Sequence, residues 1–282
     1  MGFKLTENSY GKSVVRLTKV TRRGAWHDLL EMSCDIQLQG DFESAYANGD
    51  NTNVVATDSI KNTVYILAKE TQFESIEHFG VVLAQHFVNT YAQVSKAVIE
   101  IEAPVWQRID IAGRAHEHAF TSAASEKRVC NATLARGGEI ELEAGFSDLS
   151  VIKTTASGWA NFVSDRYRTL KDTDDRIFAT FVNARWKFIG IGHDYDGAYR
   201  FMRQAMLTTF AQHHSLGVQH TLMAMGEAAL KESPGVKSIT ITMPNKHRVL
   251  FDLSRFGLEN DNEIFVSTEE PYGLISGTVT RD

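Results

Sequence analysis

Cysteine is scarce in this sequence, and the patterns that depend on it are missing. Only two cysteines occur, Cys34 and Cys130, and no CxxC pair exists. A thiolate zinc site needs closely spaced pairs, and a disulfide framework needs more cysteines than these two. We therefore expect both thiols to be reduced and structural.

Long hydrophobic runs and excess positive charge are also lacking. The apolar stretches are short, with residues 81–84 as a typical example, and fall far short of the roughly 20 residues that cross a bilayer. Twenty-nine basic residues are outnumbered by 35 acidic ones, which gives a formal net charge of −6. A general nucleic-acid binder carries the opposite balance. We expect neither a membrane nor a nucleic acid as partner.

Several motifs of common enzymes are absent as well. The chain contains no GxGxxG, GxxxxGK[ST], GxSxG or HExxH sequence. A dinucleotide loop, a triphosphate loop, a hydrolase elbow and a zinc-protease helix are therefore not indicated. What remains is an ordinary globular composition, with 43% hydrophobic residues, in a chain long enough for about two domains.

A short strand pattern occurs twice. Residues 99–104 and 239–244 each alternate apolar and polar side chains and end in proline, at an offset of 140 residues. Alternation predicts a strand with one buried face, and the proline is expected to stop each strand because it cannot donate to the ladder.

Helical and strand-like segments surround both copies. Thr71 to Glu74 has capping-box spacing, and an apolar stripe follows to Tyr91; a second stripe begins at Ala198 and a third at Val218. Strands are expected near residues 14–20, 30–37, 63–68, 149–154 and 177–188. Each half then reads as strand, strand, helices, strand, strand.

This order predicts an α+β fold, with antiparallel sheets and helices on one face. We place the units at residues 1–138 and 139–282, because Gly137 and Gly138 mark a plausible boundary. The alternative is a single α+β domain in which the repeat arose by chance.

A few polar groups have spacings suited to chemistry. Asn245 and His247 follow Pro244 at a spacing of two, so in extended chain both side chains project from one face and could bind a small ligand and move a proton. Ser215 is a candidate helix cap, which would offer the Val218 amide, with Gln219 beside it, to an anion. A hairpin turn and an ordinary capped helix are the simpler interpretations.

Other candidates are equally open on residue type. Arg176 follows two acids and could form a surface pair or grip a planar anion, and Trp159 could stack on a ligand or lie in the core. Residues 57–59 favour a turn. For His116 and His118 a polar loop is a better interpretation than a metal site. For residues 213–214 the better interpretation is a solvated helix end.

Taken together, these segments resemble the urate oxidase (uricase) family. The similarity runs from about Tyr10 to Arg281. It is carried by Tyr10-Gly11-Lys12, the run VVATDSIKNTVY at 54–65, Asp175-Arg176-Ile177 with Ala179-Thr180, Val218-Gln219, residues 244–247 and Pro271-Tyr272-Gly273-Leu274-Ile275. Each segment is short, but their joint order and intervals are highly specific.

The resemblance implies two tandem tunnelling-fold (T-fold) units and a homotetramer with sites at subunit interfaces. It implies urate and dioxygen as substrates and 5-hydroxyisourate and hydrogen peroxide as products, without metal or organic cofactor. A cytoplasmic location is expected. The alternatives are a catalytically weak purine-binding T-fold protein and a pterin-processing T-fold enzyme, although the latter needs Cys or His ligands that are in short supply here.

Site residues follow from the resemblance position by position. Lys12, Thr57 and His247 would form a catalytic proton relay. Arg176 and Gln219 would hold the purine edge, the amides of Asp58 and Val218 would bind the anion, and Asn245 with Thr57 would frame the oxygen position. Trp159 stands where the family usually has a stacking phenylalanine, so its indole is expected to stack on the substrate.

Overall fold

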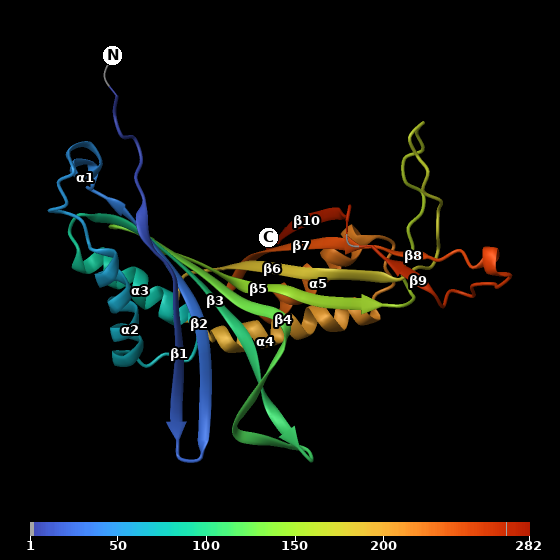
Figure 1. Ribbon diagram of the computed structural model, residues 1–282, viewed down its shortest axis with the longest axis horizontal. Coiled ribbons are helices and arrows are strands. Elements are labelled where there is room, and N and C mark those ends of the chain that lie inside the picture. The colour runs from blue at the N-terminus through green and yellow to red at the C-terminus, as the bar shows by residue number, and fades with distance from the viewer. Residues whose placement is uncertain (1–2, 269) are drawn as a thin grey trace. The chain divides into compact units, whose positions relative to one another are not determined.

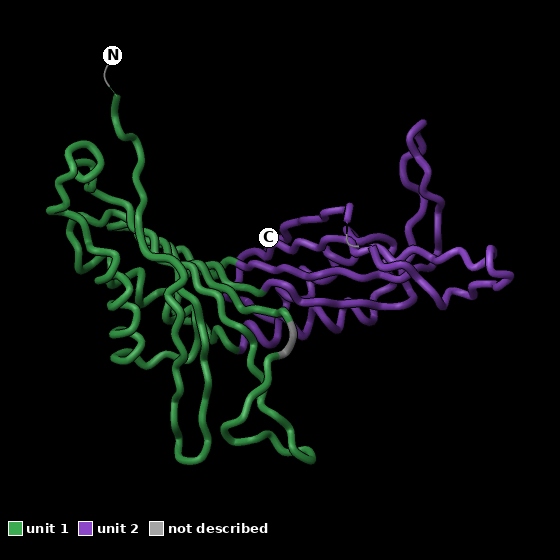
Figure 2. The backbone as a smooth tube through the Cα atoms, in the orientation of Figure 1, with its two compact units in different colours: residues 1–146, 187–196 green, residues 147–186, 197–282 purple. Residues whose placement is uncertain are grey.

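The chain folds into two compact units, shown in different colours in Figure 2. The computed structural model describes residues 3–268 and 270–282. Unit 1 comprises residues 1–146 and 187–196, and unit 2 comprises residues 147–186 and 197–282. One stretch of the second half of the sequence therefore belongs to unit 1.

Unit 1 is an antiparallel meander with helices inserted between its second and third strands (Figure 1). The strands are β1 (Tyr10–Arg23), β2 (Trp26–Gly40), β3 (Val94–Ile111) and β4 (Arg114–Ala135), and the helices are α1 (Glu43–Asn48), α2 (Thr57–Glu70) and α3 (Ile76–Thr90). Each strand pairs antiparallel with the next. Helix α3 packs against β3 and β4, and α2 packs against β1.

Unit 2 repeats this order. Its elements are β5 (Ile140–Lys153) and β6 (Phe178–Phe188), each shared in part with unit 1, then α4 (Tyr195–Gln212), α5 (Val218–Glu232), β7 (Val236–Lys246) and β10 (Gly273–Thr280). Between β7 and β10 the chain forms β8 (Arg248–Leu250), a 3₁₀ turn (Ser254–Phe256) and β9 (Phe265–Ser267). Strand β7 pairs antiparallel with β10, and α5 packs against both.

The predicted order of strand, strand, helices, strand, strand is confirmed in both halves, and with it the α+β class with antiparallel sheets. The two alternating segments lie in β3 and β7, where Ile99, Ile101, Ile239 and Ile241 are all buried. Alternation identified these strands because one face of each is covered and the other is not.

The strand predicted at residues 63–68 is wrong, because this segment lies inside α2. Ile60, Val64 and Ala68 are its buried residues, and they recur at every fourth position, which is a helical period. Valine, tyrosine and isoleucine in a row suggested a strand by residue type alone. The turn favoured for residues 57–59 is wrong for the same reason, since they form the first turn of this helix.

The prolines do not stop their strands as predicted. Strand β3 continues past Pro104 to Ile111, and β7 continues past Pro244 to Lys246. At Pro104 the pairing with β4 shifts register instead. The carbonyl oxygen of Pro244 accepts a hydrogen bond from Thr180 Oγ1 at 2.8 Å. Proline removes only the donor, so the strand persists where its carbonyl or a shifted register can be accommodated.

The capping box expected at Thr71 lies one turn too early. Helix α3 begins at Ile76, and the hydroxyl of Ser75 caps it by accepting a hydrogen bond from the His78 amide at 3.2 Å. Both Thr71 and Ser75 are suitable caps by residue type, and the packing of α3 on the sheet decides between them.

A buried ion network joins three segments of unit 1. Arg128 of β4 forms a two-pronged contact with Glu77 of α3, with Nε–Oε1 at 3.2 Å and Nη2–Oε2 at 2.8 Å. Its Nη1 donates to Asp196 Oδ1 at 2.5 Å. Only 1% of the Glu77 side chain is exposed, and burial raises its pKa although Arg128 acts in the opposite direction. The guanidinium therefore compensates a carboxylate that water cannot reach.

Replacing Arg128 by methionine should destabilise the fold strongly. The substitution keeps much of the side-chain volume but leaves Glu77 buried without its partner, which costs about 3–5 kcal/mol. We expect this loss in the free energy of unfolding at pH 8, measured by urea denaturation. Lys127→Met is the matched control, because the Lys127–Glu102 pair is exposed and should contribute less than about 1 kcal/mol.

The deficit of Arg128→Met should shrink as the pH falls. Without Arg128 the pKa of Glu77 rises further above its unfolded value, so the folded state binds more protons than the unfolded state between the two pKa values. Protonation of Glu77 therefore stabilises the folded variant at acid pH, and this stabilisation is lost as the pH rises through the folded pKa of Glu77. A deficit equal at pH 5 and pH 8, or equal losses for the two variants, would contradict the assignment.

Candidate active site

Lys12 and Thr57 lie on neighbouring elements of unit 1. Lys12 is half-buried on β1, just before an irregularity at which the pairing with β2 shifts register. Val14, in this bulge, has a φ of 57°, and its amide donates to Asp35 Oδ1 at 2.6 Å. Such bulges re-aim the side chains next to them. Thr57 is the first residue of α2 and is exposed.

Tyr10 connects these two elements. Its hydroxyl accepts a hydrogen bond from the Val55 amide at 2.8 Å and donates to the Val55 carbonyl oxygen at 3.2 Å. Tyr10 lies two residues before Lys12, and Val55 lies two residues before Thr57. The Tyr10 ring also packs edge-on against Phe42, with the ring centroids 4.7 Å apart. This contact fixes the distance between the two segments that carry the candidate relay residues.

Residue type alone did not assign this role to Tyr10. The tyrosine belonged to a recognisable Tyr-Gly-Lys motif, but nothing in the sequence indicated where its hydroxyl would bond. Gly11 in the same motif has a packing reason, because a Cβ atom there would lie 1.7 Å from the carbonyl oxygen of Ile36. Only glycine allows β1 to approach β2 this closely.

The first turn of α2 is electropositive. Its N-cap is Ala56, which makes no side-chain cap, so the amides at this end are free for an anion. Asp58 does not cancel this arrangement, because its carboxylate bonds Lys61 at 2.6 Å and Asn62 at 3.0 Å. These bonds hold the pKa of Asp58 below its ordinary value, led by Lys61, and the charge of Lys12 adds to the effect.

In unit 2, Trp159 is held by backbone pairing on both sides. It exchanges hydrogen bonds with Thr173, N to O, at 2.7 and 2.9 Å. The neighbouring Gly158 donates to the Ser215 carbonyl at 2.7 Å. The indole stacks on Phe162, with centroids 5.5 Å apart and planes inclined by 16°. The backbone of Trp159 is therefore held in place, and the stacking contact with Phe162 restrains its indole.

Arg176 lies beside this indole, and one of its hydrogen-bond donors, Nε, is unsatisfied among the described residues. Its guanidinium carbon is 5.7 Å from the centre of the Trp159 ring. Its Nε is buried and has no hydrogen-bond partner among residues 3–268 and 270–282. Burial lowers the pKa of Arg176. A half-buried guanidinium without a carboxylate to satisfy Nε is suited to a planar anionic ligand that accepts parallel hydrogen bonds.

Gln219 and Val218 open helix α5 next to Trp159. The N-cap is Gly217, not Ser215 as predicted, and it makes no side-chain cap. The Ser215 hydroxyl instead donates to the Gly217 carbonyl at 3.0 Å and accepts from Thr221 Oγ1 at 2.7 Å. Val218 is then the first helical residue, so its amide lies in the turn that lacks partners within the helix.

Asn245 and His247 follow each other around the end of β7. Asn245 is paired with Gly273 of β10, and both candidate side chains are half-buried. The His247 carbonyl accepts from the Thr268 amide at 3.1 Å and from Arg248 Nη1 at 3.0 Å. These bonds fix the backbone of His247 and leave its ring for other contacts.

The structure thus brings the candidates together within each unit. In unit 1 the Tyr10–Val55 contact joins the segment of Lys12 to the segment of Thr57 and Asp58. Unit 2 holds Trp159, Arg176, Val218 and Gln219 around the start of α5, and Asn245 and His247 at the end of β7.

Four of the other histidines contact the backbone or one another. His116 Nδ1 accepts from the Ala119 amide at 3.1 Å, and its ring contacts His118. His213 packs against His220, with centroids 4.3 Å apart, and burial lowers its pKa. Within the described chain no group of three or more His, Cys, Asp or Glu residues could hold a metal ion.

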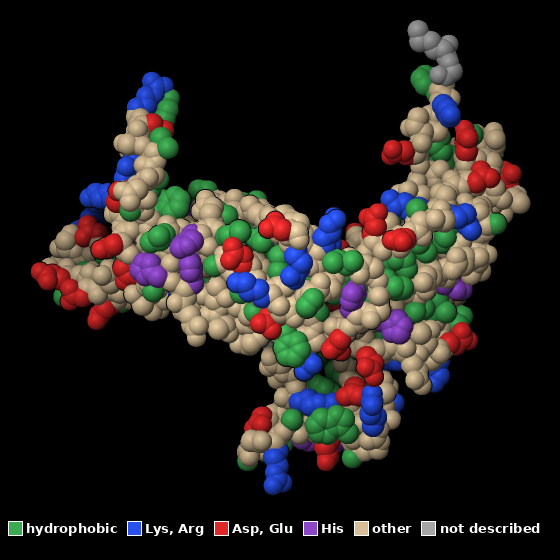
Figure 3. Space-filling model, turned by 180° about the vertical axis from the view of Figure 1, so that it is seen from behind, with side chains coloured by type: hydrophobic (Ala, Val, Ile, Leu, Met, Phe, Trp, Pro, Cys, Tyr) green, Lys and Arg blue, Asp and Glu red, His purple; other side chains and the backbone are tan. Residues whose placement is uncertain are grey.

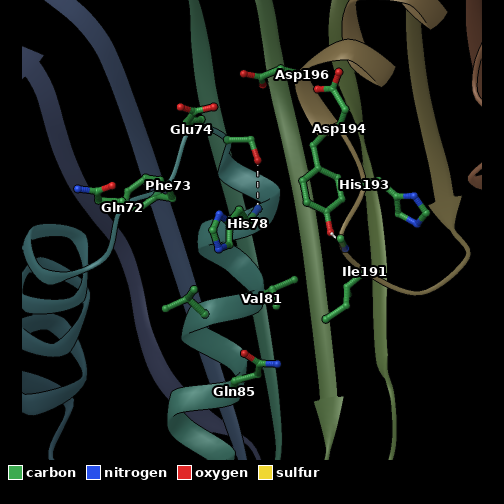
Figure 4. Close-up of a pocket in the computed structure, with 14 residues that line it drawn as sticks. Gln72, Phe73, Glu74, His78, Val81, Gln85, Ile191, His193, Asp194 and Asp196 are labelled. Carbon is green, nitrogen blue, oxygen red and sulfur yellow. Dashed lines mark hydrogen bonds between the residues drawn. The ribbon is translucent and has the colours of Figure 1, made fainter. Parts of the chain in front are cut away.

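One pocket of unit 1 contains none of the candidates. It measures about 650 Å³ and lies in unit 1 between α3 and the connection that precedes α4 (Figure 4). Two of its polar side chains are engaged by neighbouring groups. His193 stacks on Phe188 and bonds the Ile189 carbonyl at 2.8 Å, and Tyr195 accepts from the Gly192 amide.

The exposed charges of unlike sign are mixed over the face that Figure 3 shows, without a broad patch of one sign. No helix in the described ranges combines the length and apolarity needed to cross a membrane.

Two tandem antiparallel units, with polar groups gathered at helix starts and strand ends, define a T-fold enzyme. The uricase family model matches residues 8–133 and 142–276. The chain belongs to the uricase family. Family membership makes it an oxidoreductase that oxidises urate in purine catabolism, which favours this activity over the pterin-processing and non-catalytic alternatives.

Individual relatives support this assignment. Uricase of Arthrobacter globiformis is 41% identical over 99% of this chain and 90% of its own length, and that of Dictyostelium discoideum is 36% identical over 98% and 97%. The crystal structure of the Arthrobacter globiformis uricase has a TM-score of 0.94, covering 100% of this chain and 96% of that one. A Bacillus sp. TB-90 urate oxidase, 22% identical with a TM-score of 0.84, supports the fold alone.

Removing the Tyr10 hydroxyl should impair turnover of urate. Tyr10→Phe keeps the ring against Phe42 but loses both bonds to Val55, so the segments of Lys12 and Thr57 are no longer tied together. We expect kcat to fall about tenfold or more, because small displacements of reacting groups are costly. Steady-state kinetics measures this.

Tyr65→Phe is the control, because Tyr65 joins α2 to β1 by one exposed bond to the Arg16 carbonyl. It should leave kcat within about twofold of the parent, since that bond is remote from the turn that carries Thr57. Equal effects of the two substitutions would show that Tyr10 has no particular positioning role.

Proposed function

We propose that the chain oxidises urate with dioxygen and water to 5-hydroxyisourate and hydrogen peroxide, using the two groups of residues described above. The observation that carries the proposal is the unsatisfied, buried Nε of Arg176 beside the Trp159 indole and the open first turn of α5. A flat purine anion matches all three features, since it offers a ring face to stack and oxygens to accept hydrogen bonds.

Binding is assigned to unit 2. Arg176 and Gln219 hold the purine edge, the Val218 amide binds the anion, and Trp159 stacks on the ring. The Asp58 amide of unit 1 adds a donor from the uncapped start of α2. Both helices present partly positive ends, which stabilise negative charge on the bound purine.

Proton movement is assigned to Lys12, Thr57 and His247. Urate must lose a further proton before it donates electrons readily to oxygen, and an amine, a hydroxyl and an imidazole form a chain that can accept and pass it. Two electrons pass from the purine to dioxygen, which leaves as peroxide. Water adds to the oxidised ring, so one oxygen atom of the product comes from water. Asn245 and Thr57 hold the oxygen and water above the ring, and positioning supplies most of the rate.

The assembly that completes this site is a homotetramer. Lys12 and Thr57 belong to the first half of the chain, and Arg176, Gln219, Asn245 and His247 to the second. We propose that each site joins the first half of one subunit to the second half of another. The tandem halves are residues 1–138 and 139–282, the reaction needs no cofactor, and the enzyme acts in the cytoplasm.

The reaction can be tested directly. Purified protein in aerated buffer should consume urate, followed by its absorbance, together with oxygen and with formation of one peroxide per urate. Lys12→Met and Thr57→Ala should each lower kcat by about a hundredfold or more, since proton transfer by a positioned group contributes that much. Lys231→Met, an exposed lysine in the last turn of α5, is the control and should be unchanged. A parent protein that consumes no urate would refute the proposal.

Mixing two inactive variants tests the shared site. Lys12→Met and Arg176→Gln should each be inactive alone. If each site takes Lys12 and Arg176 from different subunits, reassembly from an equal mixture restores about one quarter of the parent activity, because half of the pairs are mixed and one of their two sites is intact. Co-refolding followed by the urate assay measures this. No recovery in verified mixed tetramers would place both residues of a site in one chain.

A further inference from the structure

The Trp159 indole occupies the space where a side chain at Gly217 would begin. A Cβ atom at Gly217 would lie 2.8 Å from Trp159 Cζ3 and 3.1 Å from Cε3. A carbon atom so close would clash with the ring unless the ring moved. The six-membered ring of the indole is thus seated directly on the backbone at the start of α5.

The requirement for glycine at this position comes from the indole and not from the backbone. Gly217 has φ 160° and ψ 161°, an extended conformation that any residue adopts. The third neighbour of the Cβ position is Gln219 Oε1 at 3.6 Å, which is an ordinary contact. Only Trp159 stands in the way of a side chain here.

The indole cannot simply move aside. Its backbone is paired with Thr173 in both directions, and its face is stacked on Phe162. Arg176 lies 5.7 Å from the ring centre. A side chain at Gly217 would therefore push the ring relative to both Arg176 and Gln219, the two groups assigned to the purine edge.

We propose that Gly217 is a positioning residue for substrate binding, because it leaves room for the Trp159 indole. By doing so it sets the geometry of Trp159, Arg176 and Gln219 around the purine. The inference rests on the proposed function for the role of Trp159. Its consequence is that residues 159 and 217 are coupled. A smaller ring at 159 leaves space that a side chain at 217 can fill, whereas the large ring tolerates only glycine.

A double-mutant cycle tests the coupling, using the parent, Gly217→Ala, Trp159→Phe and the double variant. Gly217→Ala alone should lower Tm and raise KM for urate about tenfold, as expected for overpacking at a rigid site. In the Trp159→Phe background the same substitution should change both quantities by less than about twofold, because the clash is gone. The effect should fall on KM more than on kcat, since the relay residue Lys12 lies on another element.

Gly138→Ala is the matched control. Its Cβ would meet Ala135 O at 3.4 Å and Ala135 Cβ at 3.8 Å, which are ordinary contacts, and it lies in an exposed turn far along the chain from the binding residues. It should leave Tm and KM unchanged. A Gly217→Ala effect of the same size in both backgrounds would overturn the inference.

Anaerobic binding of urate separates this inference from the proposed function. Equilibrium dialysis of urate without oxygen should show the same coupling as KM. If the parent bound urate but did not oxidise it, the proposed reaction would fail while coupling in Tm and in binding would still support the role of Gly217. Coupling in Tm with none in urate binding would reduce the pair to a packing contact and overturn the positioning role.

Discussion

Two guanidinium groups, that of Arg128 and the half-buried one of Arg176, show how the structure satisfies its charges. Arg128 is bonded by Glu77 and Asp196, and it ties β4 to α3 and to the first turn of α4. Glu77 is almost fully buried and Arg128 is 15% exposed, so each needs the other, whereas Asp196 is 45% exposed. Arg176 is also withdrawn from water, but its Nε has no partner in the described ranges, and burial lowers its pKa. The guanidinium group of Arg128 thus stabilises the packing of unit 1, whereas that of Arg176 in unit 2 remains available for a ligand.

Helix starts repeat this division of roles. Helix α3 is capped by the Ser75 hydroxyl, and it belongs to the packed interior. The N-cap residues of α2 and α5 are Ala56 and Gly217, which supply no side-chain cap, and these helices carry Thr57 and Val218. Helix α1, which carries no candidate residue, also lacks a side-chain cap. A cap would consume the amide hydrogens that an anion needs. Missing caps at these positions therefore agree with an anionic substrate.

Around these open positions the backbone is held firmly. Tyr10 fixes the start of α2 to β1, and the paired strand-like segments at Trp159 and Thr173 fix the aromatic platform. Rigid supports of this kind suit a reaction in which holding purine, oxygen and water in place supplies most of the rate. If these supports were flexible, the bound reactants would keep more of their freedom of movement, and the rate advantage of holding them in place would be lost.

The sequence by itself determined the order of elements and the family, because alternating and helical periods reflect which faces are buried and because the ordered short motifs are specific to uricases. It did not determine local details such as the helix at 63–68, the strands continuing past Pro104 and Pro244, or the cap at Gly217, since residue types there suit two conformations and packing chooses one. Only the tertiary structure showed that Tyr10 bonds Val55 and that Trp159 sits on Gly217. Those contacts join residues about 45 and 58 positions apart, and such contacts follow from the fold rather than from any local pattern.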